Sequence, residues 1–208
     1  MACSTPASSC PTEGERLAAL LAEVRACRRC AAVLPLGPRP VLSLGLGARL
    51  LIVGQAPGTR VHATGIPWND PSGDRLRAWL GLEREQFYDE RRIAIVPVGL
   101  CYPGRDRRGG DLPPRPECAP TWFPRLRPFL AAVRLTLLVG AHAQAYHLGE
   151  ARKRDLAATV RAFREYLPAC FPLPHPSPRN LGWLRRHPWF EAEVLPALRA
   201  ELARALAD

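Results

Sequence analysis

Three short apolar runs, each ending in glycine, most constrain the fold of this chain. They are ARLLIVG at 48–54, RIAIVPVG at 92–99 and LTLLVG at 135–140, and CFPLPH at 170–175 adds a short strand or extended segment. The segments between them contain helical patterns. Apolar strands that alternate with helices predict a parallel sheet that is covered on both faces. We therefore expect an α/β fold of three layers, α/β/α, with a central, mainly parallel sheet of four strands.

The remaining segments divide into helices and loops. Residues 13–34 have helical apolar spacing, whereas 101–120 are too rich in glycine, proline and charge for regular structure. Ser72 is the expected N-cap of the next helix. We expect residues 1–12 to form a flexible tail and 13–208 a single domain. The other predicted helices are 72–82, a broken helix at 121–133, 141–148, 156–167, and 188–207 with an interrupting proline.

The charge balance points to a partner class. The chain of 208 residues has 29 basic and 19 acidic residues and a net charge of +10, with Lys153 as its only lysine. This excess favours a polyanionic partner such as nucleic acid, although a generic solvated basic surface would give the same balance.

The compartment is inferred from what the sequence lacks. There is no run of about 18 uninterrupted apolar residues, so we expect no membrane span. The first dozen residues lack a basic region followed by an apolar run, so no signal peptide is visible. We expect a cytoplasmic protein whose seven cysteines are metal ligands, catalytic groups or buried thiols rather than disulfides.

Two motifs lie after the first apolar run. LLIVGQAPG ends in a glycine turn, Gly54 to Gly58, which lets a ligand approach the backbone closely. TGIPWNDPSG follows, with Trp68 in a Gly/Pro loop. Trp68 is either a stacking platform for a flat ligand or a core tryptophan. Asp70 offers a carboxylate, or else makes a local turn bond.

A third motif, FPLPHPSPRN at 171–180, lies near the end of the chain. Its prolines exclude a helix and remove N–H groups that a central strand would need. An imidazole held between prolines, as in His175, can donate a hydrogen bond to negative charge that develops on a substrate. Ser177 and Arg179 suit phosphate contacts. The plainer alternative for His175 is a structural role.

The cysteines form a possible metal site. Cys27 and Cys30 make a C-x-x-C, and Cys101 and Cys118 bracket the long polar loop. Four thiolates can hold zinc or an iron–sulfur cluster. A thioredoxin-like role lacks the expected preceding strand. The other three are interpreted as ordinary thiols: Cys3, Cys10 and Cys170.

Taken together and in this order, these motifs resemble the uracil-DNA glycosylase superfamily over roughly residues 20–200. GQAPG resembles its first motif. HPSPRN resembles its second, in the form associated with the single-strand-selective monofunctional branch. GQAPG with GIPWNDPSG is closer to the bacterial iron–sulfur branches, whose four cysteines occur in a similar arrangement. The resemblance therefore favours a structural [4Fe-4S] cluster over zinc, tying the N-terminal helix to the polar loop.

The resemblance implies a role for each motif residue. Such enzymes flip a nucleotide out of DNA and break its N-glycosidic bond. His175 would stabilise the anionic base through its O2, and Trp68 would stack on the base in place of the family's usual phenylalanine. Three residues of the first motif would supply the base pocket and its oxyanion contacts from the backbone: Gly54, Gln55 and Ala56. Three residues of the second motif would contact DNA. Ser177 would hold a flanking phosphate, and Arg179 and Asn180 would fill or brace the gap left in the duplex.

The sequence also departs from the family pattern. Ala56 stands where several branches carry a water-activating Asp or Asn, and Gln55 where one iron–sulfur branch carries Glu. Since glutamine cannot act as a general base, Asp70 becomes the candidate, with His62 as an alternative. Pro97 stands where other branches read uracil with an asparagine amide. A different substrate, such as a deaminated purine, then becomes credible.

These inferences define the functional hypotheses. The first is a monomeric, monofunctional DNA glycosylase that releases uracil, or else hypoxanthine or xanthine, in base excision repair. No lyase activity is expected, because Lys153 lies in a charged segment between elements. The alternative is a catalytically weak or inactive protein of the same fold that senses damaged or single-stranded DNA. A cluster-based redox protein has only the cysteines in its favour.

Overall fold

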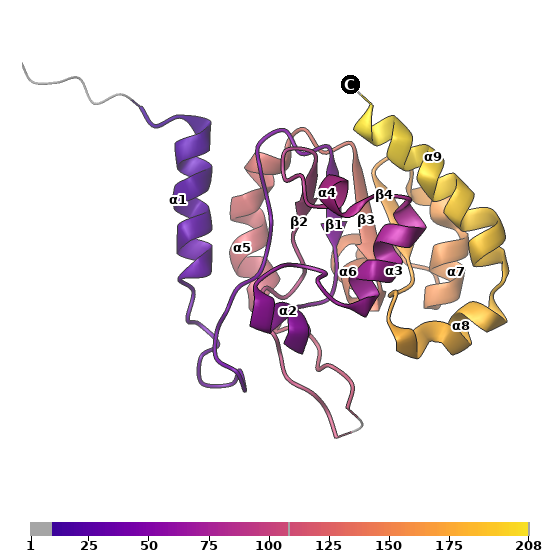
Figure 1. Cartoon of the computed structure of the whole chain (residues 1–208), viewed down its shortest axis with the longest axis horizontal. Coiled ribbons are helices and arrows are strands. Elements are labelled where there is room, and N and C mark those ends of the chain that lie inside the picture. Colours follow the sequence, from indigo (N-terminus) through magenta and orange to yellow (C-terminus); the bar gives the residue numbers. More distant parts are fainter. Residues whose placement is uncertain (1–9, 108, 208) are drawn as a thin grey trace, which may run out of the picture.

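The computed structural model describes residues 10–107 and 109–207, and one sheet organises them (Figure 1). Its strand order is β2-β1-β3-β4, and every neighbouring pair is parallel. This confirms the predicted α/β fold with four central strands. The strands are β1 (Leu50–Val53), β2 (Ile93–Ile95), β3 (Leu135–Val139) and β4 (Cys170–Leu173).

Helices account for most of the remaining regular structure. The α-helices are α1 (Glu13–Arg25), α2 (Thr59–Thr64), α3 (Pro71–Leu80), α4 (Arg84–Phe87), α5 (Cys118–Leu126), α6 (Ala141–Leu148), α7 (Leu156–Arg161), α8 (Leu181–Arg186) and α9 (Leu195–Leu206). Short 3-10 turns are η1 (Arg127–Leu130), η2 (Gly149–Ala151), η3 (Phe163–Tyr166) and η4 (Pro178–Asn180), and η5 (Phe190–Val194) is a π-helix. No helix in the described residues is long and apolar enough to cross a membrane.

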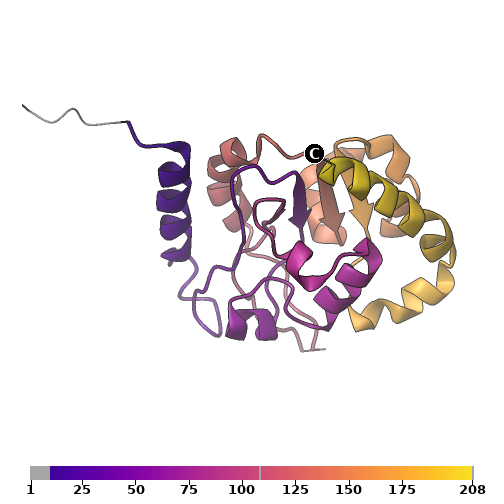
Figure 2. The same cartoon turned by 45° about the horizontal axis from the view of Figure 1, so that its top comes forward.

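The sheet lies between two layers of helices (Figures 1 and 2). Successive side chains of a strand point to opposite faces. Leu50 and Ile52 of β1 therefore pack with residues of α3, α7 and α9, whereas Leu51 and Val53 pack with residues of α1, α5 and α6. Both faces of β1 are apolar because both are buried, which is why its sequence is a continuous apolar run rather than an alternating one.

Several element boundaries differ from the predictions. The helix predicted over 13–34 ends at Arg25, because turn hydrogen bonds replace helical ones through the C-x-x-C segment. Asp70, and not Ser72, is the N-cap of α3: its Oδ1 accepts the Gly73 N–H at 2.8 Å, and proline suits the first helical position. The short helices α2, α4 and α8 were not predicted. The tail predicted over 1–12 lies mostly outside the described residues.

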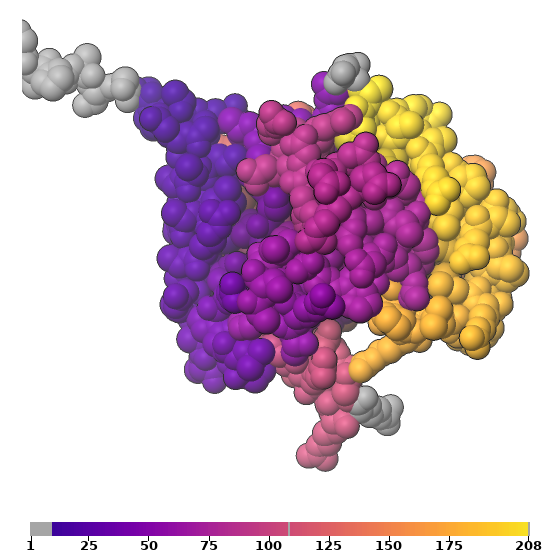
Figure 3. Space-filling view, viewed as in Figure 1, coloured from indigo at the N-terminus to yellow at the C-terminus, as the bar shows by residue number. Residues whose placement is uncertain are grey.

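The parallel topology places the three motif loops at one edge of the sheet. The loops after β1, β2 and β4 all leave from carboxyl ends of parallel strands, where open α/β sheets bind their ligands. In Figure 1 this is the lower edge, with α2, α8 and the loop between β2 and α5 along it. Figure 3 shows that loop projecting below the rest of the molecule.

Candidate active site and cysteine cavity

A cavity lies at the carboxyl ends of the strands. The space between its walls, including the part that is open to solvent, is about 610 Å³. Its walls come from the loops after β1 and β2, the segment before α3, and the loop after β4. The predicted site residues that line it are Gly54, Gln55, Ala56, Trp68, Asp70, His175 and Ser177, together with Pro97.

Trp68 is held rigidly at the cavity. It is the only described non-glycine residue with positive φ, at 56°, and its ring lies against His175 with centroids 5.5 Å apart and planes tilted by 34°. A Cβ on Gly54 would lie 2.8 Å from Cζ2 of that ring, so glycine is required for this approach. The ring also packs against the core. The ring is thus partly buried against the core, as one interpretation from the sequence expected, whereas its role as a stacking platform stays a prediction.

The hydrogen bonds of His175 define its chemical state. Its Nδ1 accepts the Ser177 N–H at 3.2 Å, so in the neutral ring the proton lies on Nε2. Burial lowers the pKa of His175, the charge of Asp70 opposes that shift, and His142 adds to it. The imidazole is therefore a neutral donor near pH 7. This is the form that donates a hydrogen bond to a developing anion without itself carrying charge.

The second-motif loop is braced from two directions. The Asn180 amide Nδ2 donates to the His175 carbonyl at 2.8 Å, and Arg75 of α3 donates to the Pro176 carbonyl at 3.0 Å. Gly140 lies behind His175, where a Cβ would come within 3.3 Å of the histidine Cβ. In the structure Asn180 therefore positions the histidine, a contact that the sequence did not reveal because it depends on how the loop folds back.

Gln55 uses its side chain on the protein. Its side-chain Nε2 donates to the Leu112 carbonyl at 2.9 Å. The backbone carbonyl of Gln55 accepts the Gly99 N–H at 2.8 Å. The backbone N–H groups of Gln55 and Ala56 donate to no other described residue. These two N–H groups remain available for the predicted oxyanion contacts, while the amide side chain fixes the loop between β2 and α5.

The cavity lining lacks three predicted residues, which are His62, Arg179 and Asn180. His62 is on α2 beside Val61, which does line it, and adjacent helical residues point about 100° apart. The His62 ring faces Tyr102, with centroids 6.2 Å apart, and its buried Nδ1 has no hydrogen-bond partner among the described residues. Arg179 lines an open groove next to the cavity and donates to the Gly109 carbonyl.

Two carboxylates meet at this site, and the sequence indicated only one. Asp70 caps α3 through Oδ1, so the local bond anticipated from the sequence is present, while its Oδ2 lies 3.8 Å from the position of a Cβ on Gly58. Asp111 Oδ2 lies 3.7 Å from the same position. Asp111 belongs to the loop between β2 and α5, and nothing in its local sequence distinguishes it from other loop aspartates.

The comparison with known families decides the assignment. A family model described as the uracil DNA glycosylase superfamily matches residues 43–199, which is most of the chain. The chain belongs to this superfamily. The solution NMR structure of a candidate uracil DNA glycosylase from Methanosarcina acetivorans is similar, with 18% sequence identity and a TM-score of 0.47. That match covers 76% of this chain and 93% of the other. The assignment rests on the family match alone.

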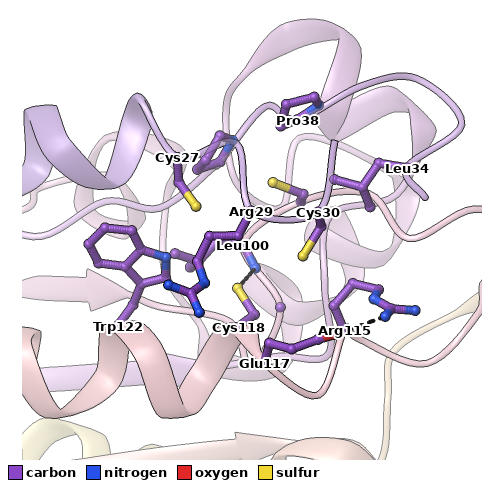
Figure 4. Close-up of a pocket in the computed structure, with 13 residues that line it drawn as sticks. Cys27, Arg29, Cys30, Leu34, Pro38, Leu100, Arg115, Glu117, Cys118 and Trp122 are labelled. Atoms are coloured by element: carbon purple, nitrogen blue, oxygen red, sulfur yellow. Dashed lines mark hydrogen bonds and ion pairs between the residues drawn. The ribbon is translucent and has the colours of Figure 1, made fainter. Parts of the chain in front are cut away.

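Within this superfamily fold, the four predicted cysteine ligands line one cavity on the face of α1 and α5. Figure 4 shows Cys27, Cys30 and Cys118 around a common space, and Cys101 lines it too. The Leu100 N–H donates to the Cys118 sulfur at 3.3 Å. Arg29 and Arg115 are the basic residues in the wall. The fold thus brings together two cysteine pairs that are about 70 residues apart in sequence.

Burial favours the protonated form of two thiols in this cavity, Cys101 and Cys118. Burial raises the pKa of Cys101 and of Cys118 to about 11, and neighbouring cysteines of the set add to both shifts. Among the described residues, no group of three or more His, Cys, Asp or Glu is arranged to hold a metal ion. The donor set itself, four cysteines around one cavity, is that of Cys-ligated zinc and of iron–sulfur clusters.

Proposed function

We propose that the protein is a monofunctional DNA glycosylase that hydrolyses the N-glycosidic bond of a deaminated base flipped out of DNA. The observation that carries the proposal is the state of His175. It is a half-buried, neutral imidazole whose proton lies on Nε2, and it stands beside the Trp68 ring in the cavity. Stacking and one neutral donor suit a flat base that leaves as an anion.

The reaction assigns a task to each side of the cavity. Breaking the bond leaves negative charge on the base and oxocarbenium character on the sugar. The Nε2–H of His175 would stabilise the base, and the free N–H groups of Gln55 and Ala56 would add oxyanion contacts. A carboxylate oxygen of Asp70 remains free to act on the attacking water. Ser177 and Arg179 would hold the DNA backbone beside the open groove.

Base specificity is the least constrained part of the proposal. Pro97 lines the cavity at the end of β2 and has no amide with which to read uracil. We expect uracil as the main substrate, with hypoxanthine and xanthine as alternative substrates for the same cavity. Lyase activity is not expected, because the only lysine, Lys153, is outside the cavity and pairs with Glu165 at 2.5 Å.

We also propose that the cysteine cavity holds a structural iron–sulfur cluster, [4Fe-4S], with Cys27, Cys30, Cys101 and Cys118 as ligands. Two features support a cluster held by these cysteines. The four cysteines line one cavity, and Arg29 in its wall would offset part of the negative charge of a cluster with four thiolates, while Arg115 there pairs with Glu117 at 2.9 Å. The cluster would supply no step of the hydrolysis. It would tie α1 to the loop between β2 and α5.

The decisive experiment measures base release. Labelled oligonucleotides would carry uracil opposite guanine, uracil opposite adenine, single-stranded uracil, hypoxanthine or xanthine, and alkali would reveal abasic sites. The wild-type protein should cleave at least one, and His175→Ala should lose about 100-fold or more in rate with DNA binding retained. His62→Ala, which removes an imidazole near but outside the cavity, should keep most of the activity. An inert wild-type protein that still binds DNA would favour the alternative, a protein that senses damaged or single-stranded DNA. Two features favour that alternative: the side-chain amide of Gln55 is bonded to the protein, and Pro97 has no side-chain amide.

A further inference from the structure

We propose that Asp111 is a second catalytic carboxylate, which holds the attacking water jointly with Asp70; this rests on the hydrolysis proposed above. Each aspartate uses one oxygen to fix its position. Asp70 Oδ1 accepts the Gly73 N–H at 2.8 Å, and Asp111 Oδ1 lies 3.7 Å from Nε of Arg105. Among the described residues, no hydrogen bond reaches either Oδ2.

The two free oxygens face one spot. Asp70 Oδ2 and Asp111 Oδ2 lie 3.8 Å and 3.7 Å from the point where a Cβ on residue 58 would be. Residue 58 is glycine with φ of −81°, a conformation that any residue can adopt, so the backbone does not require glycine here. What glycine provides at this position is open space within 4 Å of an oxygen of each carboxylate, at the cavity wall.

The loop that carries Asp111 is built to bring it there. Residues 104–107 and 109–112 form the two antiparallel arms of a hairpin. Arg105 and Asp111 pair across it, and the Leu112 N–H donates to the Gly104 carbonyl at 2.9 Å. Gln55 Nε2 fixes the Leu112 carbonyl, the residue next to Asp111. The first motif, GQAPG, thus has no carboxylate side chain, but its Gln55 holds the loop that carries the carboxylate of Asp111.

The chemistry balances without a further reactant. The water oxygen forms a bond to C1′ of the sugar as the bond from C1′ to the base nitrogen breaks, and the electron pair leaves with the base. One carboxylate accepts the water proton and later returns it to solvent, while the base anion takes a proton from solvent. In inverting glycoside hydrolases, too, a carboxylate acts as the general base on the attacking water.

Single-turnover base release by the full-length protein tests this proposal. Asp111→Asn and Asp70→Asn should each slow the rate by about 100-fold, with DNA affinity unchanged or raised because a negative charge is removed. Because both act on one water, the double variant should lose far less than the product of the single losses. Arg105→Gln removes the ion-pair partner of Asp111 but keeps its carboxylate, and should cost much less than Asp111→Asn.

Gly58→Ala provides a test that leaves both carboxylates in place. Its methyl would make ordinary van der Waals contacts and should leave the melting temperature near that of wild type, yet it would fill the space of the water and slow base release about as much as Asp70→Asn. A wild-type rate for Asp111→Asn, multiplicative losses in the double variant, or an Arg105→Gln loss equal to that of Asp111→Asn would overturn this role while leaving the glycosylase standing. A wild-type protein inert on every substrate would overturn both.

Discussion

Gly54→Ala should separate the positioning of the base platform from its chemistry. The new Cβ would lie 2.8 Å from Cζ2 of Trp68, whereas two carbons in contact need about 3.5–4.0 Å. The ring must therefore retreat by about 1 Å. It has little room to do so, since His175 lies on it and the carbonyl of Trp68 is packed against Gly73.

The expected magnitudes follow from that displacement. A shift of about 1 Å in a positioning group costs about 100-fold in rate, and overpacking of this kind costs about 1–3 kcal/mol of stability. For a chain of this length, each kcal/mol lowers the melting temperature by about 2–4 °C. Single-turnover base release and thermal unfolding monitored by circular dichroism would measure the two effects separately.

A second substitution makes the test specific. Phenylalanine has no atom at the position of Cζ2, so Trp68→Phe in the Gly54→Ala background should recover both melting temperature and rate relative to Gly54→Ala alone. Gly182→Ala is the matched control, because a Cβ there meets nothing within 4 Å. Full activity and stability in Gly54→Ala, or no recovery in the double variant, would refute the argument that Gly54 exists to admit the tryptophan ring.

Three further outcomes are expected. Protein purified anaerobically should be brown, with broad absorbance near ~400 nm, and Cys118→Ser should lose colour and iron; colourless protein containing zinc would exclude the cluster. Burial lowers the pKa of His147 to about 4 and also lowers that of His175, so the unfolded state binds more protons below the usual pKa near ~6.5. The free energy of unfolding should therefore fall as pH drops from about 6.5 toward 4, by about 3 kcal/mol from His147 alone; chemical unfolding of wild type and His147→Gln across this range measures it. Arg179→Ala should weaken DNA binding and reduce the salt dependence of log K by about one unit, and an unchanged slope would remove Arg179 from the phosphate contacts.

The sequence was sufficient for the fold because the fold is set by local patterns. Apolar runs with glycine ends define the strands, and a continuous run such as that of β1 can only belong to a strand buried on both faces. Short helices were missed for the opposite reason. α8 has only six residues, Leu181–Arg186, which are too few to show a helical repeat of apolar positions.

The sequence could predict those parts of the candidate site whose contacts lie within a single motif. His175 and Ser177 are two residues apart, and the bond between them is set within one proline-flanked turn. Asp111 and the contact of Gln55 with Leu112 were not predictable in the same way, since 57 residues separate the members of that contact. Only the pairing of β1 with β2 brings those loops together.

The hairpin connects the two sites of the molecule. Cys101 precedes it and Cys118 follows it, so the cysteine cavity holds both ends of the segment that presents Asp111. Gln55 holds the same segment from the first motif. Figure 3 shows the described part of this segment projecting outward, where residues 105–107 and 109–112 are exposed or half-buried, so its order depends on these anchors. A group bound by the cysteines would therefore influence catalysis without touching the base, by fixing the loop on which the second carboxylate stands.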